Sequence, residues 1–150
     1  NTMMIEYRHN DRRWDVWAEH VNYGKDFRAD MGFINRVDYE RNTLRVGHTW
    51  RYETGSFLDR IWLALDWDNT HDQEGLELEE EVEVFFELDG PLQSRLNGLF
   101  GGSKTYFNGI YFDEQFNQLA LTLRPSSDLY ARMTVRVEEH AKLPAPDPAI

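Results

Sequence analysis

The chain has 150 residues, a formal net charge of −11 and no cysteine, and 14% of its residues are aromatic. This length suffices for one domain, and the negative charge argues against a nucleic-acid partner, because binding phosphates requires a basic surface. The absence of cysteine excludes disulfides, thiolate metal sites and cysteine nucleophiles, and no apolar run approaches the ~18 residues of a membrane-spanning helix.

The first predicted elements are two strands, at residues 3–9 and 13–22, joined by a turn at Asn10-Asp11. The chain begins directly in this strand-like sequence, without the charged and apolar regions of a signal peptide. We therefore expect a fragment or a processed piece of a longer protein.

Residues 23–35, YGKDFRADMGFIN, show no periodicity and predict an ordered loop or a bulged strand. Within this stretch Arg28 lies between Asp26 and Asp30, so charge-assisted hydrogen bonds can hold the loop. Gly32 can adopt backbone angles that are closed to other residues. We interpret these four residues as structural and not as a ligand site.

Alternation of apolar and polar residues resumes at Arg36 and continues, after Asn42, to Glu53, which predicts another long strand. A turn at 54–56 leads to the next strand, whose apolar face comes from Ile61, Leu63, Leu65 and Trp67. Residues 71–75 then form a polar turn.

The stretch 76–88, LELEEEVEVFFEL, has the clearest period-two pattern of a β-strand. One face is apolar except for Glu80, and the other is acidic except for Phe85. At about 3.3 Å per residue its thirteen residues extend ~40 Å, which favours a strand that crosses a bilayer. We expect its apolar side chains to share one outward face with those of the neighbouring strands. These side chains are Leu76, Leu78, Val82, Val84, Phe86 and Leu88.

The glycine-rich stretch 95–112 predicts two strands around a Gly101-Gly102-Ser103 turn, or one strongly coiled hairpin. Two regular strands follow at 116–124 and 129–138, separated by a turn at 125–128.

Together these elements predict an all-β fold, an antiparallel up-and-down meander of about eight to ten long strands that is part of an outer-membrane-type β-barrel. We assign residues 1–141 to this barrel segment and residues 142–150, KLPAPDPAI, to a proline-rich tail. In a membrane barrel the abundant tryptophans and tyrosines would form interfacial girdles, whereas in a soluble protein they would be ordinary core aromatics.

No arrangement of residues points to catalysis. The serines near turns lack a nucleophile elbow, and the histidines lack the paired spacing of a zinc-binding helix. The histidines are His9, His20, His48, His71 and His140. We therefore expect no enzyme activity, no cofactor and no metal site.

The glutamates of the acidic face form the most conspicuous charged feature. Carboxylates in such a row can bind calcium or supply the pair that hydrolyses a glycosidic bond. We favour a solvated surface or a watery lumen, because surface charges need no further function and arginines of other strands can pair with them. The glutamates are Glu77, Glu79, Glu81 and Glu83, and the arginines are Arg45, Arg51, Arg132 and Arg136.

Three strings carry a resemblance to a known family: GKDFRADMGFINRVDY, PLQSRLNG and FNGIYFDEQFNQLALTLRPSSDLY. They resemble the C-terminal barrel of a bacterial outer-membrane family of unknown function, whose members typically carry a family-9-like carbohydrate-binding module ahead of the barrel. The similarity covers most of residues 13–137, and its most specific parts are the D-F-x-x-x-M-G-F-x-x-R run and the later L-R-P-S-S.

The resemblance implies a Gram-negative outer-membrane location, outer-membrane lipid as a partner and an incomplete barrel. It carries over no catalytic residue. The carbohydrate module suggests glycan binding or passage as a hypothesis, with carbohydrate as a candidate partner. The alternative is a soluble antiparallel barrel or sandwich that binds a small or carbohydrate ligand on exposed aromatic residues. A third interpretation, a glycosidase, rests only on the density of carboxylates.

Overall fold

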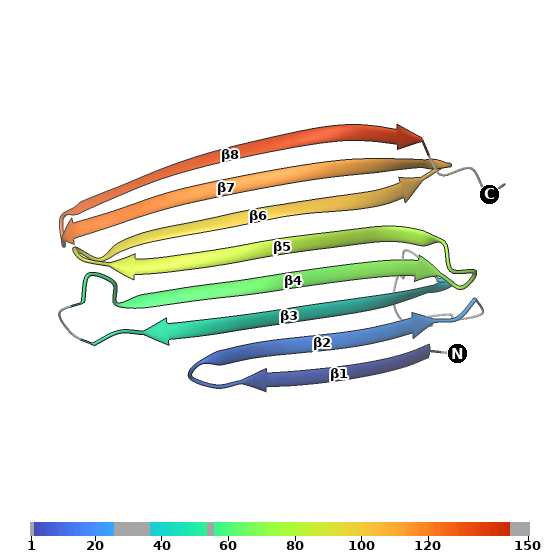
Figure 1. The fold of residues 1–150 in the computed structure, drawn as a ribbon, viewed down its shortest axis with the longest axis horizontal. Coiled ribbons are helices and arrows are strands. Elements are labelled where there is room, and N and C mark those ends of the chain that lie inside the picture. The colour runs from blue at the N-terminus through green and yellow to red at the C-terminus, as the bar shows by residue number, and fades with distance from the viewer. Residues whose placement is uncertain (1, 26–36, 54–55, 145–150) are drawn as a thin grey trace.

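The computed structural model describes residues 2–25, 37–53 and 56–144, and the side chains of 2–25, 37–53 and 56–141. All regular secondary structure in these residues is β-strand (Figure 1). The strands are β1 (Thr2–Asn10), β2 (Trp14–Tyr23), β3 (Tyr39–Arg51), β4 (Arg60–Asp72), β5 (Glu77–Gly90), β6 (Ser94–Phe107), β7 (Ile110–Ser126) and β8 (Leu129–Pro144). No helix in the described residues is long and apolar enough to cross a membrane.

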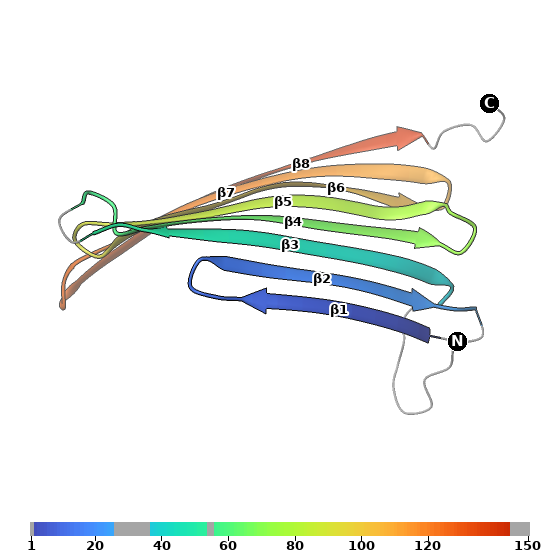
Figure 2. The ribbon, with the colours of Figure 1, turned by 60° about the horizontal axis from the view of Figure 1, so that its bottom comes forward.

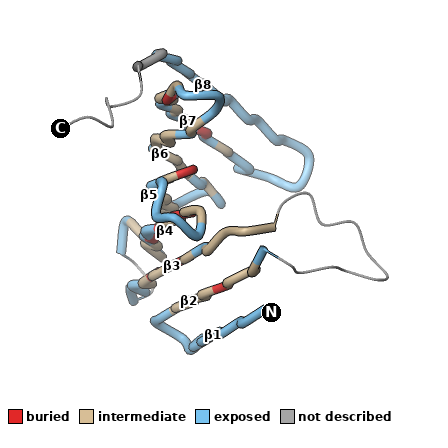
Figure 3. Tube along the Cα trace, turned by 90° about the vertical axis from the view of Figure 1, so that its right-hand side faces the viewer, coloured by how far each residue is buried: buried red, intermediate tan, exposed pale blue. Residues whose placement is uncertain are grey.

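The strands form one sheet in the order β1-β2-β3-β4-β5-β6-β7-β8, and every neighbouring pair is antiparallel. This topology confirms the predicted all-β up-and-down meander. Figure 2 shows the twist of the sheet, and Figure 3 shows it nearly end-on as a single layer. The outer strands β1 and β8 pair only with β2 and β7 within the described residues.

The cross-strand register divides the side chains between two faces, because directly opposed residues point to the same side. One row of partners runs Tyr7, Ala18, Leu44, Trp67 and Val82, and we call its side the apolar face. The next row runs Arg8, Trp17, Arg45, Asp66 and Glu83, and we call its side the polar face.

The apolar face is the more exposed of the two. Its exposed side chains come from all eight strands. They are Met3, Ile5, Tyr7, Trp14, Leu44, Trp50, Leu63, Leu65, Val82, Phe100, Leu119, Leu121, Leu123, Met133, Val135 and Val137. The polar face is more covered. Its buried side chains are Val21, Thr43, Ala64, Asp66, Thr70 and Ala120. The sheet therefore lacks the second layer that normally covers an apolar face.

The acidic strand β5 follows its predicted alternation over most of its length. Val82, Val84, Phe86 and Leu88 lie opposite the apolar side chains of β4, as expected. Leu78 differs, because it is only 3% exposed and lies beside a shift in the β4–β5 register. Such a β-bulge inserts one extra residue and breaks the period-two pattern locally.

The predicted turn at Gly101-Gly102-Ser103 is wrong, because β6 continues through these residues. Aromatic rings cover two of the three glycines in the strand: Phe86 lies over Gly98, and Phe116 lies over Gly101. The chain turns instead at Asn108-Gly109, whose φ angles are 51° and 81°. This dipeptide favours the tight hairpin turn that requires positive φ at both positions.

The remaining boundaries differ from the predictions by a few residues. β3 begins at Tyr39, and β8 ends at Pro144, beyond the predicted start of the tail at Lys142. The predicted structural loop residues lie outside the described residues. They are Asp26, Arg28, Asp30 and Gly32.

Candidate functional site

Carboxylates concentrate at the centre of the polar face, where two acidic pairs lie opposite each other across β4 and β5. Glu83 is opposite Asp66, and Glu81 is opposite Asp68. Like charges in directly opposed positions destabilise a sheet, by about 0.2–1 kcal/mol for a pair. The sequence pattern found the glutamates, but only the strand register shows that aspartates face them.

Arg45 is the cation in this carboxylate cluster. Its Nε donates to Oδ2 of Asp66 at 2.9 Å, and its guanidinium lies over the ring of Phe85. Asp66 is only 6% exposed, and within the described residues its other oxygen, Oδ1, is buried without a hydrogen-bond partner. Thr43 donates a hydrogen bond to Asp68. The cluster therefore holds more negative charge than its neighbours neutralise.

The structure brings together only part of the predicted set. Glu79, Glu81, Glu83 and Arg45 lie on the polar face of adjacent strands. Glu77 is beside the bulge, where its carboxylate pairs with Nζ of Lys104 at 3.3 Å. The other predicted arginines lie on distant strand segments. Arg51 is at the end of β3, and Arg132 and Arg136 are on β8.

The central carboxylates do not converge on one point as calcium ligands would. In the part of the chain that the structure describes, one group of three ligand-type side chains has mutually close ligand atoms, within 4.8 Å of one another. That group is Glu114, Glu138 and His140, on β7 and β8. Glu114 is half-buried and the other two are exposed, and Glu138 is already paired with Arg136.

The charges near the β5–β6 turn contrast with this excess, because here Glu87 and Asp89 each have arginine partners. Arg60 pairs with Glu87 and, at 2.7 Å, with Asp89. Arg95 pairs with Asp89 at 2.7 Å and with Glu87 at 3.4 Å. This network links three strands and needs no ligand to balance it.

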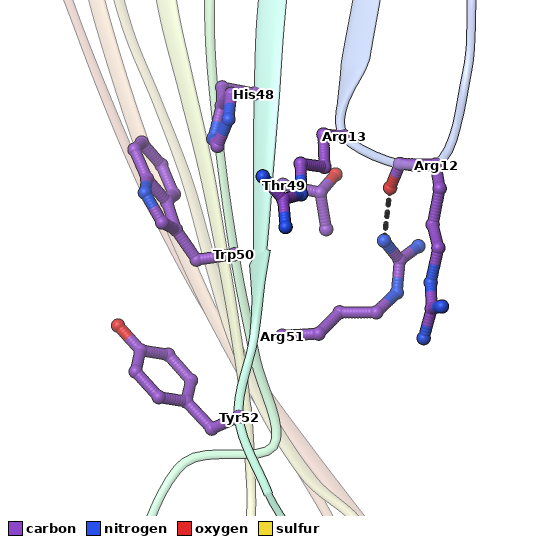
Figure 4. Close-up of a pocket in the computed structure, with 7 residues that line it drawn as sticks. All are labelled: Arg12, Arg13, His48, Thr49, Trp50, Arg51 and Tyr52. Carbon is purple, nitrogen blue, oxygen red and sulfur yellow. Dashed lines mark hydrogen bonds between the residues drawn. The ribbon is translucent and has the colours of Figure 1, made fainter.

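A cavity of about 580 Å³ lies at the end of β3, next to the β1–β2 turn (Figure 4). It is lined by Arg12, Arg13, His48, Thr49, Trp50, Arg51 and Tyr52, none of which is acidic. Figure 4 shows His48, Trp50 and Tyr52 on one side of β3, with Arg51 and the arginines of the turn on the other. The rings of His48 and Trp50 lie 4.2 Å apart. The only sequence signal for this cavity is the pair of adjacent arginines, Arg12 and Arg13, next to a turn.

Asp11 shapes the turn beside this cavity. Its Oδ1 accepts hydrogen bonds from the backbone amides of Trp14 at 2.7 Å and Arg13 at 2.6 Å, and His9 contacts Oδ2 at 3.0 Å. These contacts favour the charged carboxylate, the Trp14 amide most strongly, and they lower the pKa of Asp11 from 3.8 to about 2.

We expect this turn to loosen in acid. Because folding lowers the pKa of Asp11, its contribution to stability is present above pH 3.8 and is lost as the pH falls toward about 2. Hydrogen exchange of the Arg13 and Trp14 amides should accelerate over this interval relative to amides in β4. An Asp11→Asn variant keeps an acceptor without a titrating charge, so it should show no such step. An equal step in that variant would assign the effect to another group.

Comparisons with protein-family models, with curated proteins and with solved structures found no match. The resemblance to an outer-membrane barrel family and the role that it implies therefore stay predictions. The two faces of the sheet and the charges that they carry are the features that bear on function.

Proposed function

We propose that this chain forms an arc of a membrane-embedded β-barrel, with the apolar face against lipid and the polar face along a water-filled passage. The main support for the proposal is which side chains of β4 are exposed and which are buried. Leu63 and Leu65 are each 45% exposed, whereas Ala64 and Asp66 between and after them are 1% and 6% exposed. A soluble sheet has the opposite order, with leucine covered and aspartate in water.

The extent of the apolar face supports a lipid partner. Contiguous exposed apolar patches on soluble monomers rarely exceed a few hundred Å², and this face extends across the sheet from Ile5 on β1 to Val135 on β8. Along β4 its apolar run from Ile61 to Trp67 covers about 20 Å at ~3.3 Å per residue. The apolar band of outer-membrane barrels is about 25 Å tall, and aromatic girdles flank it.

The excess of carboxylates supports a passage that prefers cations. Asp66, Asp68, Glu81 and Glu83 produce a negative potential on the covered face, and Arg45 neutralises only part of it. A row of carboxylates between walls of low dielectric constant selects ions by the sign of their charge. The family resemblance extends the proposal to the bacterial outer membrane and to a glycan as a further candidate solute.

Ion selectivity in a planar bilayer tests the proposed passage. The reconstituted protein should conduct weakly and prefer potassium over chloride. Replacing Glu79, Glu81 and Glu83 by glutamine should reduce this preference while leaving the fold intact, because lumen substitutions change selectivity. A control with the same change in charge replaces Glu53, Glu74 and Glu139 by glutamine and should keep most of the preference.

Two results would contradict the proposed passage. Inserted protein without any conductance would mean that the polar face does not line an open passage. An unchanged ion preference in the triple glutamine variant would place these carboxylates on an outer solvated surface.

A further inference from the structure

We infer that the cavity at the end of β3 binds the phosphate of a membrane lipid headgroup, an inference that rests on the proposed membrane location. The lining of the cavity is positively charged, although the chain as a whole has a net charge of −11. Arg12, Arg13 and Arg51 meet in its lining, which contains no aspartate or glutamate. A planar guanidinium group can donate two parallel hydrogen bonds to a phosphate.

These three arginines have no carboxylate partner among the described residues. The guanidinium of Arg51 donates to the backbone carbonyl of Arg12, which holds the two side chains near each other (Figure 4). Three acids line the adjoining hollow with these arginines, and of these Asp15 has no partner among the described residues whereas the other two are already paired. Asp11 accepts the amides of its own turn, and Glu87 pairs with Arg60 and Arg95. Three guanidinium groups beside one unpaired carboxylate leave the cavity with a surplus of positive charge.

The different lengths of neighbouring strands create this cavity. The β2–β3 ladder starts at the pair Trp14 and His48, and the amide of Thr49 donates to the carbonyl of Arg13 at 2.7 Å. Beyond that bond β3 continues to Arg51 without a β2 partner, so its end is open on that side. The short β1–β2 turn leaves room for a ligand at the end of the sheet.

The aromatic residues of the cavity point to a lipid. Trp50 and Tyr52 line the cavity and are 42% and 48% exposed. Trp14, 45% exposed, lies next to them with its ring 4.3 Å from that of His48, where the apolar face ends. Tryptophan and tyrosine in this position prefer the boundary between hydrocarbon and headgroups. Acyl chains along the apolar face would place the attached phosphate at the end of β3, within reach of the arginines. A free phosphate ion has no acyl chain and would not contact the aromatic residues.

Binding to vesicles of two compositions tests the inference. One set contains phosphatidylcholine alone, and the other contains phosphatidylcholine with phosphatidic acid, whose phosphate monoester is exposed. Wild-type protein should bind both sets, and should bind the second more tightly. The Arg12→Gln, Arg13→Gln, Arg51→Gln variant should lose about a hundredfold in affinity for the second set and little for the first, since each of the three basic residues near an anionic surface contributes about a fivefold factor.

The matched control variant is Arg124→Gln, Arg132→Gln, Arg136→Gln, which removes three exposed arginines from β7 and β8 at the opposite edge of the sheet. It should keep most of the affinity for phosphatidic acid vesicles. Equal losses in both variants would show a non-specific charge effect and overturn the inference. Inorganic phosphate that competes at millimolar concentration would reassign the site to the free ion. Failure of wild-type protein to bind either vesicle would instead reject the membrane location itself.

Discussion

Replacing Leu65 by arginine is expected to cost about 2–4 kcal/mol of folding free energy in lipid vesicles, the cost of arginine on a lipid face near the bilayer midplane. Leu65 lies near the middle of the apolar run on β4 and is 45% exposed. In water the same substitution at such an exposed site would change stability by only about 0.5 kcal/mol. The size of the change in folding free energy therefore distinguishes a lipid-facing Leu65 from one exposed to water.

Reversible urea unfolding in phosphatidylcholine vesicles, followed by tryptophan fluorescence, measures this difference. A matched control is Phe57→Arg, because Phe57 is 80% exposed and lies in the β3–β4 connection outside the strands. This variant should unfold like the wild type. Equal stability of the Leu65→Arg variant and the control would remove the basis for a lipid-facing surface.

Replacing Gly101 by alanine is expected to lower the free energy of unfolding by about 1–3 kcal/mol, the usual cost of overpacking. A Cβ atom at this position would lie 2.6 Å from Cζ of Phe116 and 3.1 Å from the backbone oxygen of Val82. The ring would have to leave the polar face of β6. The Val82 carbonyl cannot move aside as the ring can, because it belongs to the backbone of the sheet.

A double-mutant cycle in detergent micelles shows whether the ring is responsible. In a Phe116→Ala background the Gly101→Ala substitution should cost less than half as much, because the principal clash has been removed. The same cost in both backgrounds would attribute the effect to the strand backbone instead. Gly98 offers a parallel test on the apolar face, where a Cβ would lie 2.6 Å from Cζ of Phe86.

Period-two alternation was sufficient to predict the strands and their two faces, since each side chain's direction follows from its position in the strand. The pattern failed where a side chain from another strand decides the structure. Gly101 and Gly102 indicate a turn by local propensity, but Phe116 covers Gly101 and β6 continues. The bulge at Leu78 also arises between strands, so the sequence of β5 alone does not reveal it.

The candidate sites were predictable only in part for the same reason. The row of glutamates is visible in the sequence, but the partners Asp66 and Asp68 depend on the β4–β5 register. The sequence groups Arg51 with the glutamates only as an arginine of another strand. The structure places it at the open end of β3, beside Arg12. Residues brought together by strand pairing cannot be found from spacing along one strand.

The orientation of the two faces in a membrane can be measured directly, because the chain has no native cysteine to interfere with labelling. Single cysteines at positions 133–137 of β8 would carry spin labels in phosphatidylcholine vesicles. Oxygen, which concentrates in lipid, and a water-soluble nickel chelate would then compete as relaxing agents. We predict high oxygen access at Met133, Val135 and Val137, and high nickel access at Thr134 and Arg136. Equal nickel access at all five positions, or labels at 133, 135 and 137 shielded from both agents, would contradict a lipid-facing apolar surface.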